Sequence, residues 1–306
     1  MKPKIKTSRF YSEWRGHPIP DVTAFQSTIL ALRPNKPILY LAGDSSFDNK
    51  YWIPSSRSFG KPLAVDVPEI YQAAIDEPFP KPDIAFWLNH FLGNRATALN
   101  LAVEASTLKE RENTILEHDK FIRDNIRSED ILIVSIGAND IALKPTFATI
   151  CHMLHLAWLT PRSSIEKGTA WSLNYFIKMF RDQVQAYISR VIEKRKPRAV
   201  IVCMIYFPLE AGPQKSWADV QLKLLGYNSF PAQLQTAIRK MFELATTNIH
   251  IPEVTVVPCP LFDVLDGKNE KDYTDRVEPS AEGGRKIAVQ LTEIIDSLIL
   301  TEEERE

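Results

Sequence analysis

The sequence predicts an α/β protein with helices on both faces of a five-stranded, mainly parallel sheet. Continuous apolar runs recur along the chain, and such runs are typical of strands that are buried on both faces. Segments with helical periodicity alternate with these runs, as right-handed β-α-β connections require. The composition, 44% hydrophobic and 25% charged residues in 306, is that of a globular protein with a sizeable core.

The expected elements follow one another in regular alternation. The five strands are expected over 37–41, 97–103, 130–136, 198–207 and 254–257. The helices are expected over 22–32, 83–92, 104–127, 171–194, 230–246 and 280–300. Prolines without periodicity predict irregular structure over 51–82. We expect one domain over 1–306, with an N-terminal extension (1–36) and an apolar insertion (145–170).

Charge and cysteine content exclude several classes of protein. The formal net charge of −1 argues against nucleic acid as a partner, because phosphate binding needs a basic surface. Cys151, Cys203 and Cys259 have no metal-ligand spacing, so we expect buried, reduced thiols and neither a metal nor a cofactor. The basic N-terminus lacks the apolar stretch of a secretory signal and no run is long enough to span a membrane, which predicts a cytoplasmic protein. The sequence does not predict the oligomeric state.

Polar residues that can do chemistry follow three of the apolar runs. The first run ends in Gly43-Asp44-Ser45, the third in Gly137-Ala138-Asn139-Asp140, and a later segment reads Asp275-Arg276-Val277-Glu278-Pro279. The carboxyl ends of parallel strands meet at one edge of a sheet, where ligands bind. A serine on a glycine-aided turn at that edge has the position of a nucleophile.

These blocks, in this order, resemble those of the SGNH (GDSL-type) hydrolase superfamily, and the resemblance spans most of the chain. The segment 100–107, Asn-Leu-Ala-Val-Glu-Ala-Ser-Thr, is similar to the family's second block. The resemblance implies a three-layer α/β/α sandwich of flavodoxin-like type. It also implies a serine esterase or lipase that acts on a carboxylic ester, either an acyl or an acetyl ester.

The resemblance also implies roles for individual residues. Ser45 would be the nucleophile. The backbone N–H groups of Ser45 and Ala105 and the side-chain amide of Asn139 would form the oxyanion hole. The last block normally reads Asp-x-x-His-Pro, so Asp275 matches the family, whereas Glu278 stands where the catalytic histidine is expected.

Two of the matched positions depart from the family pattern. Ala105 replaces a glycine, which matters only if the backbone there needs a positive φ or if the methyl group crowds the substrate. Glu278 is the larger change. Histidine has a pKa near 6.5 and glutamate one near 4.3, so deprotonating serine becomes harder by roughly 3 kcal/mol. Asp275 beside Glu278 is a like charge that raises the apparent pKa of the pair and makes one member a better base.

Each of these residues also has a structural interpretation. Ser45 could cap a helix, and Asn139 could serve a turn. Asp140 is expected to hold its own loop in place. Glu278 could accept hydrogen bonds at a site that has lost its activity, and this interpretation stays open beside that of a carboxylate base.

Other residues offer weaker alternatives for the base. His152 and His155 lie in the apolar stretch 147–159 and could approach the site, although histidines on apolar faces usually belong to a core. His118 lies in a charged segment and is expected to be solvated. Lys50 could act as a base or bind an anion. The stretch 147–159 itself could bind an acyl chain or a partner, or fill the core.

The sequence therefore predicts a serine ester hydrolase with an altered base and a small-molecule or acyl ester substrate. The competing hypothesis is an impaired SGNH-like protein that uses the same cleft to bind a ligand or a partner. Acyl transfer to an acceptor other than water would use the same residues. The sequence does not specify the substrate.

Overall fold

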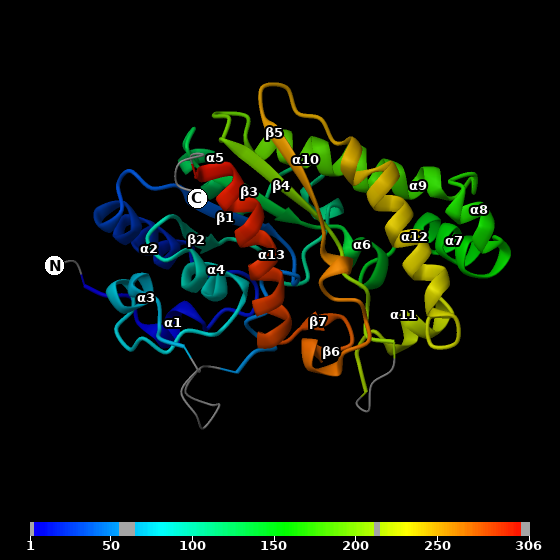
Figure 1. The fold of residues 1–306 in the computed structure, drawn as a ribbon, viewed down its shortest axis with the longest axis horizontal. Coiled ribbons are helices and arrows are strands. Elements are labelled where there is room, and N and C mark those ends of the chain that lie inside the picture. The colour runs from blue at the N-terminus through cyan, green and yellow to red at the C-terminus, as the bar shows by residue number, and fades with distance from the viewer. Residues whose placement is uncertain (1–2, 55–64, 211–214, 301–306) are drawn as a thin grey trace.

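A five-stranded parallel sheet forms the centre of the molecule (Figure 1) in the computed structural model, which describes residues 3–54, 65–210 and 215–300. Its strands are β1 (Ile38–Gly43), β2 (Thr97–Asn100), β3 (Ile131–Ser135), β4 (Ala199–Met204) and β5 (Thr255–Pro260). They pair in the order β2-β1-β3-β4-β5, and each pair is parallel. This order is the flavodoxin-like one, and it confirms the predicted fold class.

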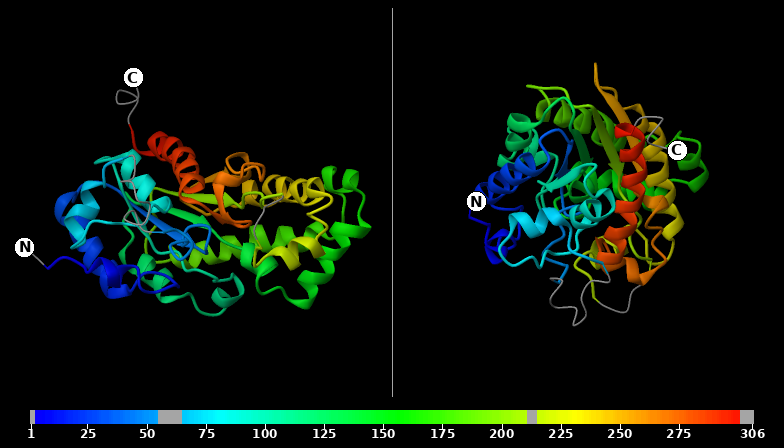
Figure 2. Two further views of the ribbon diagram at one scale, coloured as in Figure 1. Left: turned by 90° about the horizontal axis from the view of Figure 1, so that it is seen from below. Right: turned by 60° about the vertical axis from the view of Figure 1, so that its left-hand side comes forward.

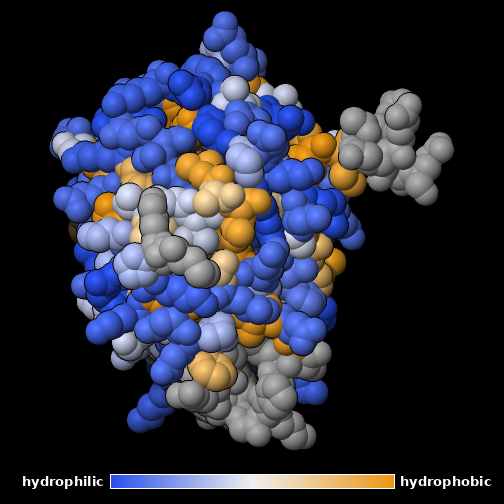
Figure 3. All heavy atoms as spheres, turned by 90° about the vertical axis from the view of Figure 1, so that its left-hand side faces the viewer, coloured by the Kyte–Doolittle hydropathy of each residue, from blue (hydrophilic) through white to orange (hydrophobic). Residues whose placement is uncertain are grey.

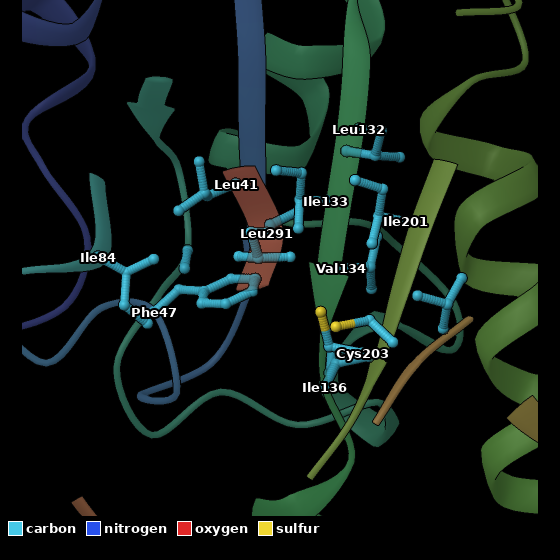
Figure 4. Packing of buried hydrophobic residues seen from close by; sticks show 14 of the residues in the cluster. Leu41, Phe47, Ile84, Leu132, Ile133, Val134, Ile136, Ile201, Cys203 and Leu291 are labelled. Atoms are coloured by element: carbon cyan, nitrogen blue, oxygen red, sulfur yellow. The ribbon is translucent and has the colours of Figure 1, made fainter. Parts of the chain in front are cut away.

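Helices cover both faces of the sheet. Successive side chains of a strand point to opposite faces, and β1 makes this visible. The hydroxyl of Tyr40 contacts Gln26 of α2 (Ile19–Leu32) and the carbonyl of Asn125 in α5 (Glu117–Asn125). Leu41 lies instead beside Leu291 of α13 (Ala281–Ile299) in Figure 4. The sheet is thus the middle layer of three.

The remaining helices are shorter or lie at the ends of the molecule. The α-helices are α1 (Thr7–Phe10), α3 (Glu69–Ala74), α4 (Ile84–Leu92), α6 (Ala138–Ala142), α7 (Phe147–Leu154), α8 (Arg162–Glu166), α9 (Leu173–Ile177), α10 (Val184–Val191), α11 (Asp219–Leu224) and α12 (Pro231–Leu244). Single turns of other helix types are η1 (Lys109–Arg111), η2 (His155–Leu159), η3 (Lys178–Gln183), η4 (Thr246–Asn248), η5 (Leu261–Asp263) and η6 (Glu270–Asp272). The hairpin of β6 (Tyr273–Asp275) and β7 (Glu278–Pro279) precedes α13.

The apolar insertion forms part of a helical group at one end of the molecule. Residues 145–170 form α7, the π-helical turn η2 and α8. These pack with α9 and α12, and Figure 2 shows this group at the opposite end of the elongated molecule from α1 and α2. In Figure 1 this group lies to the right of β4 and β5.

Several expected elements differ from those observed. The long helix predicted over 104–127 is wrong, because only η1 and α5 form within it. The irregular segment 51–82 contains the helix α3, and its residues 55–64 lie outside the described residues. The helix predicted over 171–194 is present as α9, the π-helical η3 and α10. Cys203 and Cys259 are buried as predicted, whereas Cys151 is exposed.

The surface carries the charged residues that the composition supplies. The face in Figure 3 is mainly hydrophilic, with apolar residues in small separate groups. None of the helices within 3–54, 65–210 and 215–300 combines the length and the apolar character needed to cross a membrane.

Candidate active site

Ser45 lies just beyond β1, where β1 and its neighbour β3 end together. Gly43 pairs with Ser135 of β3, and a Cβ atom on Gly43 would lie 1.8 Å from the carbonyl oxygen of Ser135. Only glycine permits this approach, which also needs a φ of +134°. The turn that follows is fixed by Asp44, whose Oδ1 accepts hydrogen bonds from the N–H (3.1 Å) and the hydroxyl (2.7 Å) of Ser46. The fold therefore holds Ser45 rigidly at the switch point of the sheet.

Asn139 lies at the end of the neighbouring strand, in the short helix α6. Its side-chain Nδ2 donates a hydrogen bond to the carbonyl of Ser106 at 3.1 Å. An amide carries two N–H bonds, so the second remains for a ligand. The next residue, Asp140, accepts hydrogen bonds from the N–H groups of Leu108 (2.8 Å) and Lys109 (3.1 Å). Asp140 thus anchors the adjoining loop, which is the structural role expected of it.

Ala105 adopts a backbone conformation that favours glycine. Its φ is +57°, which answers the question raised by the missing glycine. The loop is also linked to the other two motif segments through Ser106, whose hydroxyl donates to the carbonyl of Gly43 at 3.1 Å. In the part of the chain that the structure describes, neither the N–H of Ala105 nor that of Ser45 donates to a backbone carbonyl.

The substitution Ala105→Gly is expected to stabilise the protein by about 1 kcal/mol. A left-handed alanine costs roughly 1–2 kcal/mol, and the greater freedom of glycine in the unfolded chain offsets part of the gain. Urea unfolding measures this difference. Ala232→Gly in the first turn of α12, where φ is negative, is the matched control and should destabilise. Equal destabilisation by both substitutions would contradict the account of strain at Ala105.

Glu278 is buried at the start of β7, with 1% of its surface exposed. Burial is the main cause that raises its pKa well above the ordinary value, and the charges of Glu104 and Asp44 raise the pKa further. The nearby side chain of Ser45 acts in the opposite direction and lowers the pKa of Glu278. Its Oε2 atom has no hydrogen-bond partner among the described residues. Glu278 therefore lies beside Ser45 as a carboxyl group with high proton affinity.

Asp275 stands opposite Glu278 in the register of the hairpin, yet its carboxylate has a different partner. Its Oδ1 accepts a hydrogen bond from the hydroxyl of Ser216 at 2.5 Å. Its charge raises the pKa of Glu278, as expected of a like charge, but less than the charges of Glu104 and Asp44 do.

A cavity of about 140 Å³ brings three of the sequence-predicted residues together. Ser45, Asn139 and Glu278 all line it, whereas Ala105 and Asp275 are not among its lining residues. The rest of its wall is mostly apolar and comes largely from the helical group at the end of the molecule. Typical members are Met153, Leu156, Phe176, Phe180, Leu234 and Met241. The site can therefore hold an apolar group with a polar end directed to Ser45.

The stretch 147–159 supplies part of this wall, but not a base. Met153, Leu156 and Ala157 line the cavity, while none of the histidines in the described chain does. His152 and His155 both contact the hydroxyl of Ser172 through Nδ1, at 3.1 Å. Ser172 is fully buried, so this cluster binds α7 and η2 to the start of α9.

Two further candidates have structural partners. Lys50 is buried and donates from Nζ to Oδ1 of Asp48 at 2.5 Å, and it does not line the cavity. His118 is not solvated as predicted: it is partly buried, and its Nε2 lies 2.8 Å from the carbonyl of His17. Within the described ranges, no group of three or more histidine, cysteine or acidic side chains could hold a metal ion.

Sequence reasoning did not single out Glu104 or the part of the cavity wall formed by α11 and α12. Glu104 lies inside the second motif block, directly before Ala105, so its position was the available signal. The wall residues of α12 belong to none of the motif segments, and an amphipathic pattern does not tell a core from a ligand cavity.

No protein-family model matches this sequence, and no curated protein matches it. Solved structures do resemble the fold. A carbohydrate acetylesterase from Sinorhizobium meliloti is 13% identical, with a TM-score of 0.42 over 86% of this chain and 100% of that one. An extracellular lipase from Streptomyces rimosus is 12% identical, with a TM-score of 0.45 over 86% and 99% of the two chains. An aryl esterase from M. smegmatis is 14% identical, with a TM-score of 0.42 over 86% and 99%.

The architecture itself agrees with what the sequence blocks imply. The five-stranded parallel sheet has helices on both faces, and Ser45 and Asn139 follow adjacent strands at its carboxyl edge. The fold is therefore the three-layer α/β/α sandwich that the resemblance to SGNH hydrolases led us to expect.

Proposed function

We propose that this protein hydrolyses carboxylic esters with apolar acyl groups, with Ser45 as the nucleophile. One observation carries the proposal: Ser45, Asn139 and Glu278 come from three distant parts of the sequence, and all three line the same cavity. A nucleophile, a proton acceptor and an amide donor are the groups that acyl transfer needs at one place.

The first half of the reaction forms an acyl-enzyme. Oγ of Ser45 attacks the ester carbonyl carbon, and its proton passes to the ionised carboxylate of Glu278. The negative charge on the carbonyl oxygen is stabilised by the N–H groups of Ser45 and Ala105 and by the free N–H of Asn139. Such donors are worth roughly 3 kcal/mol each. The intermediate collapses, the alcohol leaves with the proton from Glu278, and the acyl group stays on Ser45.

The second half regenerates the enzyme. Glu278 takes a proton from a water molecule that attacks the acyl carbonyl, and the same donors stabilise the second oxyanion. Collapse of this intermediate releases the carboxylic acid and returns the proton to Ser45. Atoms and charges balance with water as the only other reactant, so Glu278 is again ionised at the end.

The environment of Glu278 compensates for the intrinsic weakness of a carboxylate base. An ordinary glutamate, with a pKa near 4.3, would hold the serine proton roughly 3 kcal/mol less well than a histidine does. Burial and the charge of Glu104 raise the pKa of Glu278 well above that value. Each unit of increase recovers about 1.4 kcal/mol of proton affinity. A buried glutamate can therefore do the work that histidine does in related sites.

The wall of the cavity supports an apolar acyl group as the substrate moiety. Apolar side chains form most of the cavity wall, and its polar members include Ser45, Asn139 and Glu278. A carbonyl at the polar part would direct its chain along the apolar wall. A cavity of similar volume in another protein holds a benzene-sized molecule, so about six carbon atoms fit.

Hydrolysis of nitrophenyl esters tests the proposal. The wild type is expected to turn over the hexanoyl ester, and Ser45→Ala is expected to have no activity above the uncatalysed rate. Ser128→Ala removes the hydroxyl of an exposed serine that does not line the cavity, so it is the matched control and should retain turnover. Equal rates for the wild type and Ser45→Ala would contradict the proposal.

A second candidate function is ligand binding by a hydrolase that has lost its base. The composition of the cavity wall favours this function, because none of the described histidines lines the cavity. The variant Glu278→His separates the two functions. If the protein is an ester hydrolase, the wild type already hydrolyses esters. If it binds a ligand without catalysis, the wild type is inert and Glu278→His gains activity.

A further inference from the structure

Glu104 is a buried carboxyl group that none of the steps above uses. It follows β2 and directly precedes Ala105, and 7% of its surface is exposed. Its Oε1 atom accepts a hydrogen bond from Nε1 of Trp52 at 3.4 Å, but its Oε2 atom has no partner among the described residues. A buried carboxylate oxygen without a partner is costly, and such groups in native proteins usually have a function.

One short turn connects Glu104 to the hairpin that carries Glu278. The side chain of Asn49 donates to the carbonyl of Pro279, the residue after Glu278, at 2.9 Å. Three residues later, Trp52 donates to Glu104. The turn 49–52 thus links the segments that carry the two carboxyl groups, and Glu104 is the charge that acts most strongly on Glu278. Each of the two has one buried oxygen without a partner among the described residues.

The backbone of Glu104 is fixed independently. Its N–H donates to Oδ2 of Asp48 at 2.7 Å. Asp48 is itself fully buried and accepts from Nζ of Lys50, so the only buried ammonium group beside this cluster in the described chain is already paired. The guanidinium of Arg15 donates from Nε to the backbone carbonyl of Glu104 at 3.1 Å, so neither of these two cations bonds to the free oxygens of Glu104 and Glu278.

The surrounding charges make both carboxyl groups hold protons strongly. Burial, and then Asp48 and Asp44, raise the pKa of Glu104 to about 8, while Trp52 and Lys50 act in the opposite direction. Burial, and then Glu104, Asp44 and Asp275, raise the pKa of Glu278. The phenol of Tyr206 donates to the carbonyl of Val277 at 2.7 Å, and burial and then the charges of Glu278 and Glu104 are among the causes that raise its pKa. Two nearby carboxyl groups in such a setting do not both ionise at neutral pH.

We propose that Glu104 is the positioning partner of Glu278: the two carboxyl groups together retain a proton in the resting protein, and Glu104 sets the pH at which Glu278 can accept the proton of Ser45. Glu104 here takes the place that the sequence resemblance gives to Asp275. The assignment of Glu278 as base rests on the proposed function, whereas the shared proton does not. The base forms once the pair has released this proton: the Ser45 proton then moves to Glu278, and the charge of Glu104 strengthens its binding there, so no further reactant is needed.

A double-mutant cycle in stability tests the pair without reference to catalysis. The free energy of unfolding is measured against pH for the wild type, Glu104→Gln, Glu278→Gln and the double variant. We expect little interaction between the two substitutions near pH 4.5, where both carboxyl groups are neutral, and an interaction that grows as pH rises. An interaction that is absent or constant with pH would overturn the proposal. The cycle of Asp275→Asn with Glu278→Gln is the matched comparison and should show a smaller rise.

The wild type gives a second readout, which does not depend on whether the variants fold. Infrared spectra near pH 7 should contain the C=O absorption of a protonated carboxylic acid, since ordinary carboxyl groups are ionised there. Absence of that absorption would overturn the proposal. If ester hydrolysis is also detected, Glu104→Gln should shift the rising limb of the pH–rate profile to lower pH, because the substitution removes the charge that raises the pKa of Glu278. A rising limb at the same pH in the wild type and in Glu104→Gln would count against the proposal. If no hydrolysis is found, the proposed function fails. The double-mutant cycle and the infrared spectrum still test whether Glu104 and Glu278 share a proton.

Discussion

Glu278→Gln is expected to lower kcat/KM for ester hydrolysis by about 10²–10⁴-fold, the usual contribution of a general base. The amide keeps the size and shape of the side chain but cannot accept the serine proton. In the wild type, kcat/KM should rise with pH through the raised pKa of Glu278, because only the ionised carboxylate acts as the base. Stopped or continuous assays of a nitrophenyl ester across pH 5 to about 10 measure both effects.

Stability should respond to pH in the opposite direction from activity. The folded protein holds the Glu278 proton more tightly than the unfolded chain does, since its pKa is raised on folding. The unfolded state loses this proton from about pH 4.5, so the free energy of unfolding falls as pH rises from there through the folded-state pKa. Glu278→Gln removes this titration and should flatten the fall. If Glu278→Gln loses activity while its free energy of unfolding above neutral pH is unchanged or higher, the variant has lost the base and not the fold.

The matched control lies four residues away. Glu282 in the first turn of α13 pairs with Arg285 at the surface, and Glu282→Gln should leave the rate unchanged. Retention of wild-type activity by Glu278→Gln would contradict the role of Glu278. A wild-type rate that rises through a pH near 4.5 would contradict the claim that its environment strengthens the base.

The second large effect concerns the length of the acyl chain. We expect kcat/KM to rise about fourfold with each added CH₂ group, since burying one is worth roughly 0.8 kcal/mol. From the acetyl to the hexanoyl ester this amounts to at most about 200-fold. The rise should then level off, because a cavity of about 140 Å³ holds a group of that size. A series of nitrophenyl esters of increasing chain length gives the measurement.

Filling the cavity should remove this preference. Ala237 of α12 lines the cavity, and Ala237→Phe should lower the ratio of hexanoyl to acetyl turnover by about tenfold or more. Ala232→Phe, on the same helix but not among the lining residues, should keep the ratio. A wild type that shows no dependence on chain length, or a ratio that Ala237→Phe leaves unchanged, would show that the acyl group binds elsewhere.

The sequence predicted the central part of this fold because buried parallel strands are locally visible. β1 and β3 are continuous apolar runs, each followed by a glycine and then by polar residues, and all of their residues are buried. Their order in the sheet and the closeness of their ends follow from the handedness of β-α-β connections. The apolar runs and the residues that follow them are therefore sufficient to predict Ser45 and Asn139 at one edge of the sheet.

The predicted helix over 104–127 failed because its charges do not all face water. Arg111 is fully buried and pairs with Asp119 at 2.8 Å, with a further hydrogen bond to the carbonyl of Gly43 at 3.1 Å. These non-local contacts hold the first half of the segment as a loop under the candidate site. A pattern of charged residues does not reveal such pairing, since it depends on residues that are distant in the sequence.

The proposed partner of Glu278 could not be found from the sequence for a similar reason. Asp275 is three residues away and lies opposite Glu278 in the hairpin, but its carboxylate bonds to Ser216. Glu104 lies far away in the sequence and is brought close by the turn that contains Trp52. Spacing along the chain predicts neighbours within one element, whereas the electrostatic environment of a buried carboxyl group is set by all the elements packed around it.

The central claim is that Ser45 is a nucleophile activated by Glu278, and covalent labelling tests it most directly. The wild type is treated with a fluorophosphonate above neutral pH, and the modified residue is located by mass spectrometry of peptides. The account predicts one adduct, on Ser45, that forms much more slowly in Glu278→Gln. No adduct on Ser45, or one that forms equally fast in Glu278→Gln, would contradict it.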